Sequence, residues 1–229
     1  ESLCAEAFTG VRARLAEETP GFYSDSQIRA WLNDGVREVA RRALWKRTSA
    51  SVTVVAGTQF YTAPSSAIQV YRVEYRPSTS GSVYRLEYRD INAMDVVWGI
   101  NQSIGRGTPE FYTLVSANPL SIELCPTPGV GGTLKVFTYA MPTDLTTNAN
   151  TDAASTLDVP VGWEDLPVEW ATALGFRKAR DVNAYQLAIG VFGQNLARLS
   201  EVATRYTDEP TSIVPDWDWG GGLMLDYGY

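Results

Sequence analysis

Residues 24–47 read SDSQIRAWLNDGVREVARRALWKR, and residues 51–64 read SVTVVAGTQFYTAP. In the first stretch apolar residues recur every three or four positions, which is typical of one face of an α-helix. In the second stretch β-branched and aromatic residues alternate with polar ones, which is typical of a β-strand. The hydrophobic period therefore changes from about 3.6 residues to about 2, and we expect a helical region to give way to a β-rich region near Thr48.

The helix expected in residues 24–47 carries signals for both of its ends. Ser24 or Asp25 can cap the first turn, because a short side-chain oxygen accepts hydrogen bonds from free backbone N–H groups there. Lys46 and Arg47 lie near the other end, where the helix dipole favours cations. The predicted apolar face consists of Ile28, Leu32, Val36, Val39 and Ala43.

The chain on either side of this stretch divides into five predicted regions. Residues 1–47 are expected to form a helical hairpin, and residues 48–140 a β-rich domain of about six or seven strands. Residues 141–161 are polar and rich in Thr, Asn and Ala, which predicts a long exposed loop. Residues 162–206 are expected to form a second helical pair, and residues 207–229 an extended tail. The predicted fold class is therefore α+β: a four-helix bundle formed by N- and C-terminal helices, with an inserted antiparallel β domain and an extended C-terminal tail.

The composition of the chain argues against several classes of protein function. The formal net charge of −7 argues against a chain-wide grip on the phosphates of DNA. Cys4 and Cys125 lie far apart and are expected to be thiols rather than a disulfide framework. No apolar run approaches the ~18 residues of a membrane span, so no membrane partner is expected. No signal peptide is recognisable at the start of the sequence.

Catalytic residues are not expected. The chain contains no histidine, which removes Ser-His-Asp triads and most catalytic zinc sites. Carboxylates at Glu164, Asp165 and Glu169, or at Asp216 and Asp218, could form a glycosidase pair only across a sugar-binding cleft. The stronger interpretation places Glu164 and Asp165 at the start of a helix, where negative charge is favoured. We predict no enzyme, no catalytic residue, no cofactor and no metal site.

A basic stripe is predicted on the helix of residues 24–47, formed by Arg29, Arg37, Arg41 and Arg42. It could face DNA phosphates or, in a ring of subunits, the acidic loops of a neighbour. The favoured interpretation is a solvated helix face with local ion pairs, such as Glu38 with Arg41 or Arg42.

The last fifteen residues, PDWDWGGGLMLDYGY (215–229), are unusually apolar and aromatic for a chain end. They could fold back onto the helices of the same chain. The alternative, that they cover a partner surface, is favoured because residues 206–215 contain two prolines and acidic residues, a composition suited to an extended spacer. The candidate partner-binding residues are Trp217, Trp219, Leu223, Met224, Leu225, Tyr227 and Tyr229.

Four motifs occur in a characteristic order. They are IRAWLNDGVREVARRALW (28–45), GTPEFYTL (107–114), SIELCPTP (121–128) and LKVFTYAMPTDL (134–145). Together they resemble the head-to-tail adaptor proteins (head completion, tail tubular A-like) of short-tailed bacteriophages, and the resemblance covers most of residues 20–206.

The resemblance implies a structural virion protein assembled in the host cytoplasm. Such adaptors form a ring, usually of about twelve copies, that docks under the portal, extends the DNA channel used in ejection and offers a platform to tail nozzle or tail fibre proteins. DNA passes without sequence-specific binding, and no catalytic residue is transferred. By the same analogy the aromatic tail is a candidate portal anchor. The alternatives are another tail component or a β-rich virion protein that binds glycans or receptors.

Overall fold

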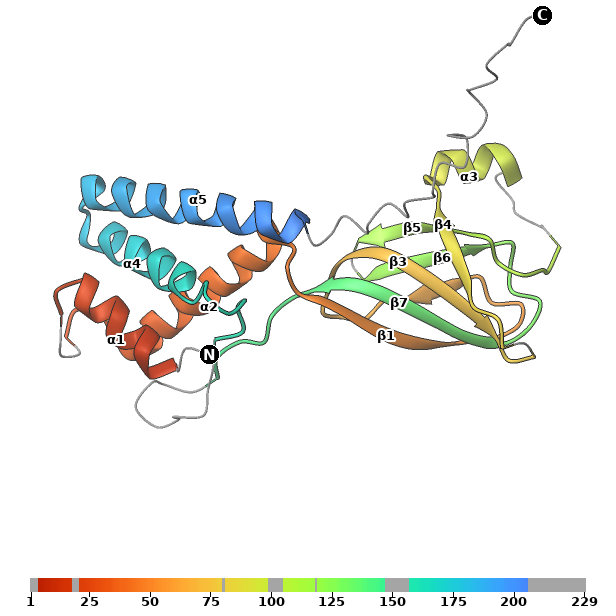
Figure 1. The fold of residues 1–229 in the computed structure, drawn as a ribbon, viewed down its shortest axis with the longest axis horizontal. Helices are drawn as coiled ribbons and strands as arrows, with labels where there is room; N and C mark the ends of the chain where they lie inside the picture. The colour runs from red at the N-terminus through yellow and green to blue at the C-terminus, as the bar shows by residue number, and fades with distance from the viewer. Residues whose placement is uncertain are drawn as a thin grey trace, which may run out of the picture.

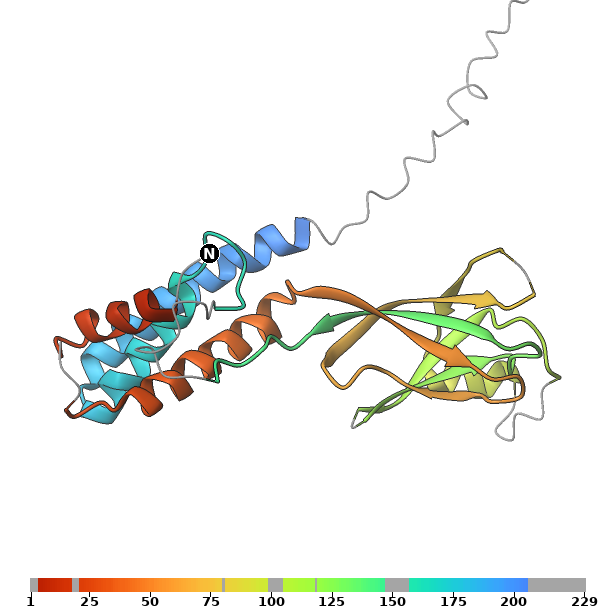
Figure 2. The same cartoon turned by 90° about the horizontal axis from the view of Figure 1, so that it is seen from below.

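The computed structural model describes residues 4–17, 21–79, 81–98, 105–117, 119–146 and 157–205. Within these residues the chain forms five helices and seven strands. The helices α1, α2, α4 and α5 gather at one end of an elongated molecule, and the strands occupy the other end together with α3 (Figures 1 and 2). The predicted α+β fold class is confirmed.

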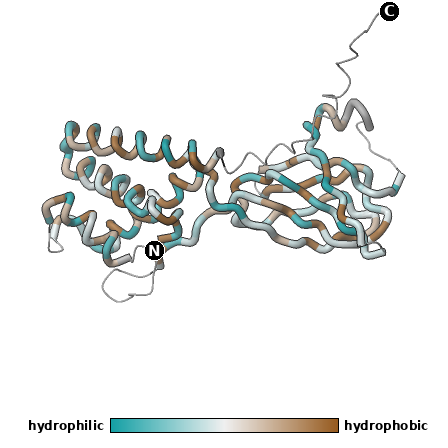
Figure 3. Tube along the Cα trace, in the orientation of Figure 1, coloured by the Kyte–Doolittle hydropathy of each residue, from teal (hydrophilic) through white to brown (hydrophobic). Residues whose placement is uncertain are grey.

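The helical end is organised around α4, which contacts α1, α2 and α5. Two groups of buried residues fill it, one between α1, α2 and α4 and the other between α2, α4 and α5. Figure 3 shows hydrophobic and hydrophilic residues alternating along these helices. The helices span Cys4–Arg14 (α1), Asp25–Ala43 (α2), Ile91–Trp98 (α3), Asp165–Ala179 (α4) and Val182–Arg205 (α5).

Helix α2 begins and ends for local reasons. Ser24 is its N-cap, and the Ser24 hydroxyl accepts a hydrogen bond of 3.3 Å from the backbone N–H of Gln27. Leu44 ends the helix in a left-handed conformation, with φ of 48°, and its N–H donates to the Ala40 carbonyl. The predicted apolar face is confirmed, because all five of its residues are buried: Ile28, Leu32, Val36, Val39 and Ala43.

The strands form one seven-stranded sheet in the order β1-β7-β3-β4-β5-β6-β2. Every strand contributes to a single apolar core, including Val54 of β1 and Tyr61 of β2, which lie at opposite ends of that order. The sheet is therefore curled around its own core rather than flat. The strands span Arg47–Val54 (β1), Phe60–Thr62 (β2), Ala67–Pro77 (β3), Tyr84–Tyr88 (β4), Phe111–Ala117 (β5), Leu120–Cys125 (β6) and Gly132–Ala140 (β7).

One pairing departs from the predicted antiparallel sheet. Strands β4 and β5 run parallel, with Glu87 opposite Phe111 and Tyr88 opposite Tyr112. Parallel neighbours need a crossover connection rather than a tight hairpin, and α3 lies in that connection. Asp90 caps α3, since its carboxylate accepts from the backbone N–H of Asn92 at 2.9 Å. The antiparallel prediction is wrong for this pair and correct for the other five pairings.

The polar stretch that follows β7 is partly packed where the structure describes it. Residues 141–146 and 157–164 form no helix or strand, but Leu145 and Leu157 are buried in the core between α1, α2 and α4. These two apolar side chains pack the segment against the helices. Thr143, Asp144, Thr146 and Val161 are exposed, so the expected exposure holds for part of this stretch and fails at Leu145 and Leu157.

Helices α2 and α4 approach closely at Gly35. A Cβ atom at Gly35 would lie 2.9 Å from the Cα of Pro167 and 3.1 Å from the Cβ of Trp170. Neither of those atoms can move without moving α4, so the glycine allows the two helix backbones to meet.

Replacing Gly35 with alanine is expected to destabilise the protein by ~1–3 kcal/mol, because overpacking forces a backbone shift. The matched control is Gly190→Ala on α5, where a Cβ meets nothing within 4 Å. That change is expected to stabilise the helix by up to ~1 kcal/mol. Urea unfolding of both variants measures the difference, and equal effects of the two substitutions would contradict the close approach.

Candidate functional site

No group of three or more His, Cys, Asp and Glu side chains that could hold a metal ion occurs among the described residues. Cys125 is a free, buried thiol. Burial, followed by the charges of Glu123 and Glu110, raises the pKa of Cys125 to about 11. The thiol therefore stays protonated near neutral pH and is a poor nucleophile.

The carboxylates weighed as an acid pair serve α4 instead. Glu164 lies at the N-cap position and Asp165 in the first turn. Hydrogen bonds from the backbone at Glu164 and Gly162 lower the pKa of Glu164. Asp165 pairs with Arg14 at 2.9 Å. These positions agree with the helix-terminus interpretation, while Asp216 and Asp218 lie outside the described residues.

Two arginines of the predicted basic stripe form the local pairs that the sequence indicated. Arg42 lies 2.5 Å from a carboxylate oxygen of Glu38, and Arg41 lies 3.9 Å from the other oxygen. The side chains of Arg41 and Arg42 are 56% and 58% exposed, so both cations remain accessible to a partner.

The other two arginines of the stripe contact the chain that returns from β7. Arg29 donates to the carbonyl oxygen of Thr146 at 2.8 Å. Arg37 forms an ion pair with Asp144 and a second one, at 3.3 Å, with Asp34. Two of the four arginines of the predicted stripe therefore hold a neighbouring segment of the same chain.

We use the name linker latch for the contacts that Arg29, Asn33, Arg37 and Lys46 make with residues 143–146 and Asp158, together with the bond between Thr143 and Asp158. Asn33 binds both backbone groups of one residue in this segment. The Asn33 amide donates to the Leu145 carbonyl at 3.0 Å and accepts from the Leu145 N–H at 2.8 Å. Asp158 accepts from the Thr143 N–H at 2.8 Å and pairs with Lys46. Except for the bond between Thr143 and Asp158, the latch joins residues more than 100 positions apart, so no local sequence pattern could have revealed it.

Asn33→Asp is expected to destabilise the protein by ~1–3 kcal/mol, because a carboxylate oxygen would replace the N–H that the Leu145 carbonyl needs. The control is Asp34→Asn, which removes only an exposed ion pair and is expected to cost less than ~1 kcal/mol. Urea unfolding provides the measurement. A larger effect at Asp34 than at Asn33 would show that the latch is not held by the amide.

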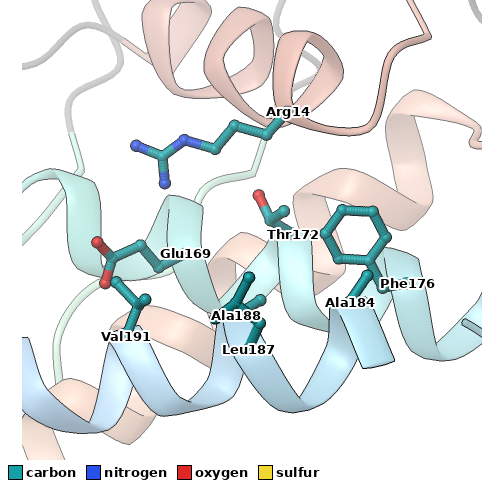
Figure 4. Close-up of a pocket in the computed structure, with 8 residues that line it drawn as sticks. All are labelled: Arg14, Glu169, Thr172, Phe176, Ala184, Leu187, Ala188 and Val191. Atoms are coloured by element: carbon teal, nitrogen blue, oxygen red, sulfur yellow. The ribbon is translucent and has the colours of Figure 1, made fainter. Parts of the chain in front are cut away.

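A second surface is a groove of about 490 Å³ between α1, α4 and α5. Helix α5 forms its floor, α4 one wall, and Arg14 extends over it from α1 (Figure 4). The sequence did not single out this groove, because α1 lies far from α4 and α5 in the chain and their contact is not visible in a local pattern. The groove is lined by Arg14, Glu169, Thr172, Phe176, Ala184, Leu187, Ala188 and Val191.

Glu169 is the polar residue at one end of the groove. One of its carboxylate oxygens accepts from the Asn195 amide at 2.8 Å. The other oxygen, Oε2, is buried and makes no hydrogen bond to a described residue. Burial raises the pKa of Glu169 above its ordinary value of 4.5, although Asn195 and Arg14 act in the opposite direction.

The raised pKa of Glu169 predicts a pH-dependent stability. The unfolded chain loses this proton near pH 4.5, before the folded protein does, so the free energy of unfolding falls as pH rises through the folded pKa. Glu169→Gln removes the titrating carboxyl group. We therefore expect the stability of the variant relative to the wild type to increase as the pH rises through this range. Urea unfolding of both proteins from about pH 4 to about pH 7 tests this; a constant difference would contradict it.

The described residues offer surfaces through which the protein can contact other proteins. These are the exposed pair Arg41 and Arg42 and the apolar groove between α1, α4 and α5. None of the helices in the described part of the chain is long and apolar enough to span a membrane.

Residues 4–215 match the family model described as SU10 adaptor protein. The chain therefore belongs to the SU10 adaptor protein family, and its resemblance to bacteriophage head-to-tail adaptors is confirmed. It is a structural component of the phage particle. A comparison with individually curated proteins gives no match.

Proposed function

We propose that the protein forms the head-to-tail adaptor ring of a short-tailed bacteriophage. In this role it docks under the portal, extends the DNA channel and provides a platform for nozzle or tail fibre proteins. The observation that carries the proposal is the family match, which includes both the helical and the β-rich regions. The ring would contain about twelve copies, assemble in the host cytoplasm and let DNA slide through during ejection.

The domain organisation supports two separate contact surfaces. We propose that residues 1–47 and 162–206 form one four-helix bundle, and that residues 48–140 are a β domain inserted into it. The apolar cores agree with this division, because one draws only on the strands and their connections and the others only on the helices and adjoining segments. An elongated subunit of this kind can reach one neighbour through its helices and another through its strands (Figure 2).

The proposed portal anchor is the segment of residues 215–229, which lies outside the described residues. Its candidate residues are Trp217, Trp219, Leu223, Met224, Leu225, Tyr227 and Tyr229. Tryptophan and tyrosine are the residues that most often dominate interface energy. Repetition of the segment around a ring makes weak individual contacts durable.

The exposed pair Arg41 and Arg42 is proposed as the part of the basic stripe that meets a ring neighbour or passing DNA. The two cations share the single carboxylate of Glu38, so this patch carries a local positive excess. Arg29 and Arg37 contribute less, because Thr146 and Asp144 already engage them.

Deleting residues 215–229 is expected to abolish co-sedimentation of the protein with portal assemblies from the same phage. Trp217→Ala combined with Trp219→Ala is expected to weaken binding at least about tenfold, because each buried aromatic contributes a kilocalorie or more. Phe60→Ala is the matched control, since this side chain is 54% exposed on the β domain. Undiminished binding of the deletion variant would refute the anchor.

A further inference from the structure

The groove between α1, α4 and α5 exposes large apolar side chains of α5. Leu187 is 73% exposed and Val191 is 42% exposed, and they lie one turn apart on α5. Ala184 and Ala188 extend the same surface toward Phe176 (Figure 4). A continuous apolar surface of this kind usually marks a binding site.

The polar residues at the groove specify what its occupant must carry. Glu169 Oε2 is buried without a hydrogen bond to a described residue, so it requires an N–H or O–H donor. Arg14 uses Nη2 to pair with Asp165, and its side chain is 40% exposed. A guanidinium has five N–H donors, so Arg14 can bind a second carboxylate.

A segment of this same chain meets these requirements. Residues 215–229 contain Asp-Trp-Asp-Trp followed by three glycines and Leu-Met-Leu. An indole N–H can donate to Glu169 Oε2, an adjacent aspartate can pair with Arg14, and the aliphatic residues match Leu187 and Val191. Residues 206–229 contain no Lys or Arg, so the segment brings no cation that Arg14 would repel.

The lengths also agree. At about 1.5 Å per residue, α5 runs about 21 Å from Arg205 back to Val191 and about 32 Å back to Ala184. The eleven residues 206–216 span at most about 36–40 Å when extended. Trp217 can therefore reach any point of the groove in its own subunit.

We propose that residues 215–229 occupy the groove between α1, α4 and α5 of the same subunit while the protein is free. The groove then shields the aromatic segment from water and from other copies. A second consequence rests on the proposed function: the portal must displace the segment from the groove, so the groove regulates docking.

The test uses the full-length protein without portal. Chymotrypsin cleaves after aromatic and leucine residues, and mass spectrometry follows cleavage at Leu225 and Tyr227. Leu187→Asp places a charge in the groove and is expected to accelerate this cleavage about tenfold, because cleavage tracks the released population. The matched control is Val202→Asp on the same helix, which lies outside the groove and is expected to leave the rate unchanged.

A double-mutant cycle makes the result specific. Trp217→Ala with Trp219→Ala is also expected to accelerate cleavage at Leu225 and Tyr227, and Leu187→Asp is expected to add little to that variant, because both changes remove one contact. Additive effects would overturn the proposal. Circular dichroism confirms that each variant is folded, and Leu187→Ser serves as a milder change at the same position.

Three further outcomes would also overturn the proposal. Faster cleavage in Val202→Asp, with no change in Leu187→Asp, would indicate that the segment binds at another site. Protection from chymotrypsin that is lost when the protein is diluted would indicate that the groove binds the segment of a second copy. Equal rates for all variants would leave the groove without this occupant. None of these outcomes involves portal, so they are independent of the failure of the portal anchor.

Discussion

The contact between α2 and α4 at Gly35 is the constraint on which the arrangement of the chain depends. Helix α2 precedes the strands in sequence and α4 follows them, so their contact forces the chain to enter and leave the β region at the same end. The register of the first and last strands agrees, since Arg47 lies opposite Tyr139, and the Ala140 N–H donates to the Lys46 carbonyl at 2.9 Å. Helix packing and the β1–β7 pairing are therefore mutually consistent.

The linker latch turns this geometry into a fixed junction, and its members contribute unequally. Burying Leu145 is worth about 1.5–3 kcal/mol, whereas an exposed pair such as Arg37 with Asp144 is worth less than ~1 kcal/mol. The Asn33 amide lies between these limits, because it satisfies both backbone groups of Leu145 in a partly buried place. Burial of Leu145 therefore contributes most to holding the returning segment on α2, and the ion pairs at its edge contribute less.

Sequence periodicity predicted the elements whose interactions are local. The apolar face of α2, its Ser24 cap and the switch to strands near Arg47 follow from spacing and residue type alone, and the order of four diffuse motifs indicated the family. The parallel β4–β5 pair and the linker latch depend on which distant segments meet, which no local pattern encodes. The groove was missed for a related reason: Leu187 becomes conspicuous only when α1 and α4 are in place and leave it uncovered.

A groove that holds the tail need not bind it tightly. A tether of this length gives an effective concentration on the order of millimolar, so an intrinsic dissociation constant about tenfold lower, on the order of 0.1 mM, already fills the groove about 90% of the time. Such an affinity still allows a partner to capture the released segment, at a cost of about a factor of ten in apparent affinity. Repetition around a ring compensates for that cost many times over. Weak binding in the subunit and durable binding in the assembled particle are therefore compatible, because the first is limited by one groove and the second is multiplied by the number of copies.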